Sequence, residues 1–574
     1  MSVPLVDESH RASLAQHGMW VTERAGAGGA VYRMPLAVRF DGPLDADAML
    51  DACAAVVRRH PVLASVLAER DGQVWAAPGE APPPILFEDV SGDAPGAQEP
   101  PAGAGSAADP AGEPGSPEWL AARVAAAPLD LGTGPVSRFT LFRLGPLSHL
   151  LLVVAHHAVF DGMSKDVLLR DLAAAYNGEE PPPLPLSYGE AARAEQERVD
   201  AGLDAAAEFW RSRWHDDREV ALPGATGSSL RAAPGEAVEL ALGDEVARAA
   251  GPLGVTRFEL LLAALHVLLH AYGNERVTVA ADLSTRTEQT RDHVGLFVNE
   301  LPVASVPDGT FAGFARSLRE ELRAVYRHRE VPLARALGGI GPRSALTPVS
   351  VSYRARPGAD PVFTGLDASV DWAMFNGAVR NTLHLQVVDA PSGLSGVLLF
   401  NPAVLGRAGC EAVAEHLRAL LRGVAARPEA PIAELPLPPR AAGPERAARQ
   451  GGEPGAAAGG AARETAGPAA DREGAGPGHA GPAAGPVPAG GSGGSGAAGT
   501  EDALVEQVAA IWCEALEVDE VRPDDDLFDL GGHSLTITRI IALVRDRMGV
   551  ELSFEVFIDD PTVSGVADEI ARSR

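Results

Sequence analysis

The chain of 574 residues is long enough for three or four domains of ordinary size, and its 46 % hydrophobic content supports globular cores. Its 48 basic and 77 acidic side chains give a formal net charge of −29, which argues against nucleic acid or an anionic membrane as a partner. The three cysteines, Cys53, Cys410 and Cys513, show no metal-ligand or redox spacing. Because no apolar run of 18 residues and no signal core occurs, we expect a soluble cytoplasmic protein.

Residues 1–180 are predicted to form a first α/β lobe. Asp45 is placed to cap a helix that Pro61 ends, and strand-like runs flank this helix on both sides. Residues 91–117 consist mainly of Gly, Ala, Pro and acidic residues without a large aliphatic side chain, so we expect a disordered insertion there.

The strongest candidates for catalytic side chains lie in residues 149–178, HLLLVVAHHAVFDGMSKDVLLRDLAAAYNG. Leu150 to Ala155 is a short apolar run that predicts a buried strand, and it ends on His156 and His157. A turn at Asp161-Gly162 follows, and Ser164 is expected to cap the next helix. Imidazole titrates near neutral pH, so a histidine at such a corner can accept a proton from a nucleophile.

Residues 181–440 are predicted to form a second α/β lobe, which begins at the stiff connector PPPLPL (181–186). The segment 259–272 predicts a strongly apolar helix, and 277–283 predicts a strand that leads to Ser284-Thr285-Arg286. Residues 441–500 break this pattern, because 44 of the 60 are Gly, Ala or Pro. We interpret them as a flexible linker with a root-mean-square span of roughly 40–45 Å.

Residues 501–574 predict a compact helical bundle. Thr500 is placed to cap its first helix, and Pro561-Thr562 precedes its last. Acidic and basic side chains number 18 and 6 in this range, so its net charge is 6 − 18 = −12. Gly531-Gly532 predicts a tight turn that leaves Ser534 at a helix N-terminus, where an anionic phosphate is favoured.

The motif HHAVFDG (156–162) matches HHxxxDG, and the chain over roughly 10–435 resembles the condensation domains of nonribosomal peptide synthetases. SLAQHGMW (13–20) and RRHPVLASV (58–66) are similar to that family's first two signatures, and HVGLFVNELPV (293–303) is similar to its GxFVNT segment. RHREVPLARAL (327–337) resembles a later segment. Two family arginines are absent, because Ala64 stands at the early position and Ala304-Ser305 at the middle one.

This resemblance implies two chloramphenicol acetyltransferase-like α/β lobes that transfer an acyl group from a carrier-bound thioester to an amine or a hydroxyl. It implies that His157 acts on the nucleophile as a general base or a positioning acceptor, and that His156 and Asp161 hold the loop and the ring. Gly162 would permit close backbone approach at the thioester. With Ala64 in place of the early arginine, Arg286 is a candidate partner for Asp161.

LFDLGGHSL (527–535) resembles the attachment signature of peptidyl carrier proteins, which are all-α four-helix bundles. The resemblance implies covalent 4'-phosphopantetheine on Ser534, attached by a phosphopantetheinyl transferase. The order condensation–linker–carrier lacks an adenylation domain, so we expect loading in trans by a standalone adenylation enzyme, with a further carrier protein as donor. The sequence does not decide between amide and ester products.

Other functions remain open at this point. A heterocyclising relative would have DxxxxD in place of the histidines, and an epimerase-like relative would normally follow its carrier. A non-catalytic carrier-docking platform is a different class of hypothesis, which the two absent arginines favour. A small-molecule acetyltransferase that uses coenzyme A would leave the carrier without a role.

Overall fold

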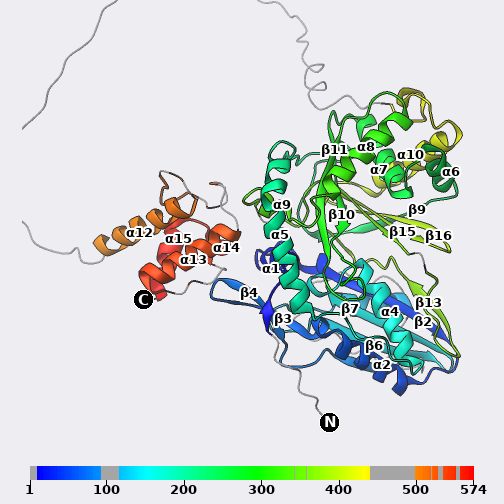
Figure 1. Cartoon of the computed structure of the whole chain (residues 1–574), viewed down its shortest axis with the longest axis horizontal. Coiled ribbons are helices and arrows are strands. Elements are labelled where there is room, and N and C mark those ends of the chain that lie inside the picture. Colours follow the sequence, from blue (N-terminus) through cyan, green and yellow to red (C-terminus); the bar gives the residue numbers. More distant parts are fainter. Residues whose placement is uncertain are drawn as a thin grey trace, which may run out of the picture.

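The structure, a computed structural model, describes residues 9–91, 116–341, 343–356, 358–439 and 498–573, except 517, 519, 526, 528–529, 531–533, 551 and 553–555. The predicted insertion (91–117) and linker (441–500) therefore lie almost entirely outside the described residues. The described chain forms two α/β lobes and a separate helical unit (Figure 1).

The first lobe is built on a five-stranded sheet with the order β13-β2-β7-β6-β5, in which β13 (Asp367–Asp371) comes from the second half of the chain. Its elements are β1 (His10–Arg11), α1 (Leu14–Arg24), η1 (Gly29–Tyr32), β2 (Arg33–Asp41), α2 (Ala46–Arg59), η2 (Pro61–Ala64), β3 (Ser65–Arg70), β4 (Gln73–Pro78), β5 (Ile85–Asp89), α3 (Pro117–Ala126), β6 (Ser137–Gly145), β7 (Ser148–His156), η3 (His157–Val159) and α4 (Gly162–Tyr176). Strand β7 is the central strand, and every residue after Ser148 is buried, as its apolar run predicted. The helices α2 and α4 pack against each other on this lobe.

The N-terminus of α4 differs from the prediction in one respect. Asp161, not Ser164, is the N-cap, and its side chain accepts a hydrogen bond from the Ser164 backbone. Ser164 is the third helical residue, and its hydroxyl accepts a hydrogen bond from the Asp161 backbone N–H, which completes a capping box. The sequence offered two capping side chains three residues apart, and the reciprocal arrangement uses both.

The second lobe contains a six-stranded sheet with the order β11-β10-β12-β15-β16-β9. Its elements are α5 (Tyr188–Arg211), β8 (Ala233–Pro234), β9 (Glu236–Ala241), α6 (Glu245–Leu253), α7 (Arg257–Ala271), β10 (Val277–Ser284), β11 (Val298–Ser305), α8 (Phe311–Tyr326), α9 (Leu333–Ala336), β12 (Val349–Ala355), β14 (Ala378–Val379), β15 (Leu383–Ala390), β16 (Gly393–Phe400), α10 (Arg407–Ala426) and η4 (Ile432–Glu434). The predicted boundary at 180/181 falls between α4 and α5.

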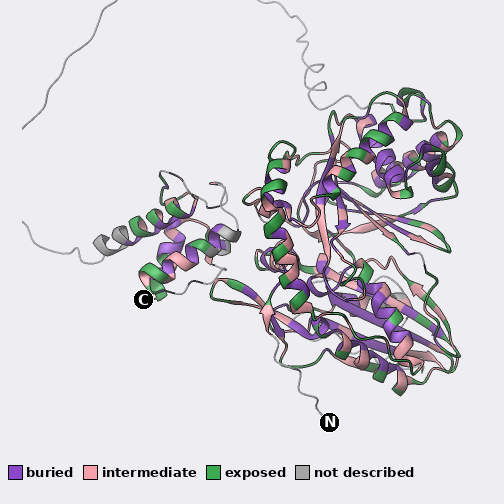
Figure 2. Ribbon diagram, viewed as in Figure 1, coloured by how far each residue is buried: buried purple, intermediate pink, exposed green. Residues whose placement is uncertain are grey.

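Alternation along the strands gives this second sheet two unlike faces. One face is apolar and packs on α7, α8 and α10 in a single core; in Figure 2 these helices show buried purple segments beside exposed green ones. The opposite face, which we call the polar face, carries charged and hydroxyl side chains and is directed to the first lobe. Its members are Asp282, Glu300, Ser350, Ser352, Arg354 and His384.

One strand of the second half of the chain belongs to the first lobe. Strand β13 (Asp367–Asp371) pairs antiparallel with β2, so the chain returns from the second lobe to the edge of the first sheet. All of 181–440 was predicted to belong to the second lobe, and β13 is an exception to that prediction. The pairing ties the two lobes together along residues 37–41 of β2, which lie opposite 148–152 at the start of β7.

The C-terminal unit consists of α12 (Ala498–Leu516), α13 (Ser534–Met548), α14 (Val556–Asp559) and α15 (Val563–Ser573). Trp512, Ile540, Val544 and Phe557 are among its fully buried side chains, as the helical periodicity predicted. Helix α12 begins at Ala498, so Thr500 lies inside the helix and is not its cap. Helix α13 begins at Ser534; the Ser534 side chain and the preceding Gly531-Gly532 lie outside the described residues.

Within the described residues, no single helix has the length and apolar composition needed to cross a bilayer. Helices α6 and α7 meet those criteria only when taken together as a pair bent by 99°, and α7 is buried in the core of the second lobe.

Candidate active site

The histidine pair lies where the central strand β7 ends and the short η3 turn begins. His156 is the last residue of β7 and is buried. Its Nδ1 accepts a hydrogen bond from the backbone N–H of Ala158 (3.1 Å), so the ring proton is on Nε2, which lies 3.1 Å from Glu23 Oε1. Both nitrogens of His156 are therefore engaged, and this ring holds the turn in place.

His157 has the opposite proton arrangement. Its Nδ1 lies 2.9 Å from the carbonyl oxygen of Phe160, and because a carbonyl only accepts, Nδ1 carries the proton. Nε2 then presents a lone pair, and no described residue donates to it. Burial lowers the pKa of His157 below its usual value, against the opposing effect of the Asp161 carboxylate, and the Arg380 guanidinium also lowers it. A neutral imidazole with one open acceptor nitrogen is the form that a base requires.

Asp161 is a brace rather than a second base, because its carboxylate is already saturated. It accepts from the Ser164 backbone (2.7 Å) and hydroxyl (2.8 Å), from the Phe297 backbone N–H (3.0 Å), and from Arg286. The Asp161 backbone N–H in turn donates to the carbonyl of Gly295 (3.0 Å). The segment 295–297 thus fixes the N-terminus of α4 from the second lobe.

Arg286 contacts Asp161 as a buried ion pair across the lobes. Its Nη2 lies 2.8 and 3.0 Å from the two carboxylate oxygens, and both side chains are 4 % exposed. Nη1 donates to the carbonyls of Thr290 (2.9 Å) and His293 (2.7 Å), and the guanidinium lies 4.6 Å from the centre of the Phe297 ring. A guanidinium therefore meets this aspartate from the second lobe, although buried Ala64 occupies the early arginine position.

The two early signature segments support the same turn. Gln16, fully buried in α1, donates from Nε2 to the carbonyl of Ala158 (3.1 Å). His60 and Arg59 each lie 2.8 Å from Asp171 of α4, which ties α2 to the helix that follows the motif. These residues contact the scaffold of the turn and not His157 itself.

Gly162 is the first residue of α4, and its carbonyl accepts from Arg354 (2.7 Å). A Cβ at this position would meet Arg354 Cδ at 3.7 Å, which is ordinary contact, and its φ is not in the left-handed region. We therefore expect Gly162→Ala to leave the melting temperature within about 2 °C of the wild type, because surface-like changes cost within about 0.5 kcal/mol. If the methyl group obstructs a thioester here, condensation falls at unchanged stability. A large loss of stability would contradict this account of Gly162.

Lys165, one turn into α4, is the only lysine of the sequence and is 4 % exposed. Burial, reinforced by Arg354, lowers its pKa from 10.5 to about 7. The pKa of Lys165 is lower in the folded protein than in the unfolded chain, so this lysine costs stability at every pH below 10.5. The cost grows as the pH falls from 10.5 to about 7 and is constant below that. Lys165→Met should therefore stabilise the protein at pH 7 by on the order of 4 kcal/mol and have no such effect near pH 11.

The single lysine allows a direct measurement of this pKa. In protein labelled with ¹³C at lysine Cε, one side-chain resonance is expected to titrate near pH 7. A midpoint near 10.5 would contradict the buried placement. Urea unfolding of Lys165→Met at pH 7 and at pH 11 provides the second measurement.

The polar face of the second lobe supplies a charged group that the sequence analysis did not single out. Asp282 on β10 and Glu300 on β11 are directly opposed in the sheet, and Arg380 Nη2 lies 3.0 Å from a carboxylate oxygen of each. Arg380 and Asp282 act on the pKa of His157 in opposite directions, so this triad lies within electrostatic range of the histidine. No motif marks three residues drawn from such distant segments.

The polar face also carries a histidine, His384, whose ring differs from that of His157 in its contacts. His384 contacts Ser350 Oγ through Nδ1 (2.8 Å) and Ser352 Oγ through Nε2 (2.9 Å). Burial, together with Arg380, lowers its pKa to about 4. Because both ring nitrogens have partners, His384 is a neutral structural group.

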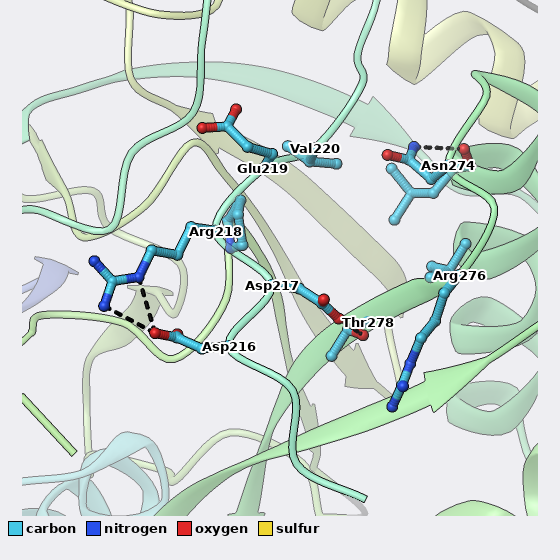
Figure 3. A pocket seen from close by; sticks show the side chains of 11 residues that line it. Asp216, Asp217, Arg218, Glu219, Val220, Asn274, Arg276 and Thr278 are labelled. Atoms are coloured by element: carbon cyan, nitrogen blue, oxygen red, sulfur yellow. Dashed lines mark hydrogen bonds and ion pairs between the residues drawn. The ribbon is translucent and has the colours of Figure 1, made fainter. Parts of the chain in front are cut away.

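One cavity lies beside the histidine turn and another lies farther away. One of about 470 Å³ lies in the first lobe, and its lining includes Trp20, Glu23 and His156. Another of about 380 Å³ lies at the start of β10, where Thr278 donates to Asp217 (2.8 Å) and Arg218 is turned to Asp216 (2.8 Å), as Figure 3 shows. Thr278 is six residues before Ser284, which is about 20 Å along the strand, so the second cavity is remote from α4.

Comparison with known families assigns both folded parts. The family model "Condensation domain" matches residues 7–443, which is more than half of the chain. The chain belongs to the condensation-domain family. A second model, "Phosphopantetheine attachment site", matches residues 506–570. The predicted order of a condensation domain followed by a carrier domain is confirmed.

Relatives of this condensation domain are segments of much larger synthetases. Tyrocidine synthase 3 of Brevibacillus parabrevis is 26% identical over 450 residues, which are 75% of this chain and 6% of that protein. Phosphinothricin tripeptide synthetase PhsC of Streptomyces viridochromogenes is 27% identical over 456 residues, which are 74% of this chain and 40% of that protein. The chain thus spans less than half the length of these curated relatives.

Solved structures confirm the predicted α/β fold class. The first condensation domain of the calcium-dependent antibiotic synthetase, in complex with a substrate analogue, has a TM-score of 0.60 at 24% identity and covers 75% of this chain and 98% of that one. The X-domain from teicoplanin biosynthesis has a TM-score of 0.58 at 23% identity, with 76% and 98% covered. At these identities the likeness establishes the fold alone.

The carrier domain carries covalent 4'-phosphopantetheine, as its family does. Ser534 opens α13, a helix of 15 residues, so a phosphate attached there would lie at a helix N-terminus. The positive end of the helix dipole and the free backbone N–H groups favour an anion at that place. This placement fits the group.

Proposed function

We propose that this chain catalyses acyl transfer from a carrier-bound thioester to an amine or a hydroxyl, with His157 acting on the nucleophile. The observation that carries the proposal is the open Nε2 of His157, fixed by the bond from Nδ1 to the Phe160 carbonyl. The α-amino group has a reference pKa near 8, so positioning contributes as well as proton acceptance.

The step that these residues support is nucleophilic substitution at a thioester carbonyl. The nucleophile attacks the carbonyl carbon, a C–N or C–O bond forms, the C–S bond breaks, and the sulfur leaves as a thiolate that takes up the nucleophile's proton from His157. His157 Nε2 accepts the hydrogen of the nucleophile, while Asp161 and His156 hold the turn that carries the ring. Bound phosphopantetheine on Ser534 would supply a terminal thiol for one of the two substrates.

The alternative of a non-catalytic docking platform depended on the two absent arginines. The Arg286–Asp161 pair weakens that alternative, because a guanidinium holds the motif aspartate from the second lobe. An epimerase-like activity has no further support in the contacts of the described residues. We therefore retain acyl transfer as the proposed activity.

The proposed partners are a phosphopantetheinyl transferase, a separate carrier protein that delivers the donor, and a standalone adenylation enzyme that loads Ser534 in trans. Ser534 converted to its phosphopantetheinyl form should gain no aminoacyl mass when it is incubated with ATP and amino acids alone. Addition of candidate adenylation enzymes should give the adduct, and Ser534→Ala should give none. Loading of the purified protein by itself would contradict the trans arrangement.

The activity itself is tested with Ser534 charged from aminoacyl-coenzyme A by the transferase. Incubation with a panel of acyl-N-acetylcysteamine thioesters should yield a carrier-bound product of the summed mass, measured by intact-protein mass spectrometry. The uncharged protein is the control for spontaneous acylation. A rate equal to that of a His157 variant would contradict acyl transfer by this site.

A further inference from the structure

The triad of Asp282, Glu300 and Arg380 has an unusual charge balance for its location. Two carboxylates directly opposite each other on neighbouring strands repel, and this arrangement normally destabilises a sheet. Arg380 bridges both through one nitrogen, Nη2, at 3.0 Å from each. One guanidinium balances one carboxylate, so the triad has a formal surplus of one negative charge.

The surroundings of Glu300 disfavour its ionised form. Burial raises the pKa of Glu300, and the neighbouring Asp282 carboxylate adds to this effect, despite the opposing Arg380 guanidinium. Glu300 Oε2 accepts from the Leu346 backbone N–H (3.1 Å) and its side chain is 14 % exposed. A further positive charge placed beside this pair would be favourable, because it would offset the surplus in a region of low dielectric.

Asp282 is the member of the triad best placed to meet a substrate. Its Oδ1 accepts from Arg380, no described residue donates to Oδ2, and its side chain is 25 % exposed. It lies on the polar face. On this face Arg354 donates to the Gly162 carbonyl, and Ser284 Oγ lies 3.8 Å from Met163 Sδ. The same face therefore carries Asp282 and reaches the motif turn that contains His157.

We propose that Asp282, held by Arg380 beside Glu300, binds the acceptor substrate in its ammonium form and so selects an amine over a hydroxyl. This inference deepens the proposed function and rests on it. An ammonium brings one positive charge and three N–H donors, which complement the surplus charge and the open Oδ2. The ammonium loses a proton to water before the neutral amine, positioned at His157 Nε2, attacks the thioester.

Glu300 stands where the resembled family segment has a different residue. The family segment GxFVNT ends in threonine, whereas Glu300 follows Asn299 here. Asn299 itself is engaged elsewhere, since its Nδ2 donates to the carbonyls of Arg329 (2.9 Å) and Val331 (3.2 Å). Glu300 and Asp282 therefore supply an electrostatic feature that the motif itself does not provide.

A binding experiment tests the assignment without the need for turnover. The probes are alanyl- and lactyl-N-acetylcysteamine thioesters, which have the same size and differ in an ammonium or a hydroxyl. At pH 6.5 the amine is mostly protonated, because α-amino groups have a reference pKa near 8. Calorimetric titration of the full-length wild type should show about tenfold tighter binding of the alanyl probe.

Asp282→Asn should remove this preference and leave the affinity for the lactyl probe unchanged. The variant keeps an oxygen that accepts from Arg380, and Arg380 keeps Glu300, so no buried charge loses its partner. Asp308→Asn, which removes the same charge from an exposed position beyond β11, should keep the tenfold preference. Glu300→Gln should weaken the preference without abolishing it, because the surplus charge is lost while Asp282 and its open Oδ2 remain.

Two results would overturn the inference. The first is that Asp282→Asn still binds the alanyl probe more tightly than the lactyl probe. The second is that the wild type binds the two probes equally or binds neither. Failure of the proposed function is a separate outcome: the preference would be present while no condensation product forms with any donor.

Discussion

Substitution of His157 by asparagine should lower the condensation rate by about 100-fold or more, because proton acceptance by a positioned side chain contributes about 10²–10⁴-fold. Asparagine is the informative replacement. Its Nδ2 can take the place of Nδ1 and donate to the Phe160 carbonyl, so the η3 turn keeps its bond. What is lost is the Nε2 acceptor. The measurement is single-turnover product formation on the charged carrier.

The decrease in the wild-type condensation rate at low pH gives a second measurement for the same residue. Burial lowers the pKa of His157, so the neutral imidazole persists below pH 6.5. With a hydroxyl acceptor on the carrier, which does not titrate in this range, the single-turnover rate should therefore fall with a midpoint below 6.5 and not above it. The exposed His215→Ala is the matched control and should retain the full rate and profile. Undiminished turnover by His157→Asn would remove the histidine from catalysis.

Local patterns in the sequence predicted most of the scaffold. The apolar run before His156 required a buried strand, and β7 is central in its sheet with neighbours on both sides. The run at 259–272 required a buried helix, and α7 lies inside the core of the second lobe. In both cases the composition of one segment decides its burial, so no knowledge of the rest of the chain is needed.

The interactions between the two lobes were harder to predict from the sequence. Arg286 was selected only because Ala64 left Asp161 without a partner, and its contact depends on the loop 284–297 folding back over α4. The exchange of β13 onto β2 and the meeting of Asp282, Glu300 and Arg380 depend on pairings between distant segments. Such pairings have no local signature, because each residue alone resembles an ordinary exposed charge.

Breaking the Arg286–Asp161 pair should cost stability on the scale of a buried ion pair, about 3–5 kcal/mol. In Arg286→Met the Asp161 carboxylate stays buried at 4 % exposure and loses its only cationic partner among the described residues. The carbonyls of Thr290 and His293 lose a donor as well. The free energy of unfolding, taken from urea titration at pH 7, measures the loss.

The double variant separates the lost pair from the lost packing. Asp161→Asn with Arg286→Met leaves no unpartnered buried charge, so its cost should be smaller than the sum of the two single costs by about 1–3 kcal/mol. The exposed pair Arg316–Glu429, at 3.2 Å, is the matched control, and Arg316→Met should change stability by less than about 1 kcal/mol. Equal costs for Arg286→Met and Arg316→Met would mean that the interlobe brace on the histidine turn is not structural. In that case the support of His157 would have to come from His156, Glu23 and Gln16 within the first lobe.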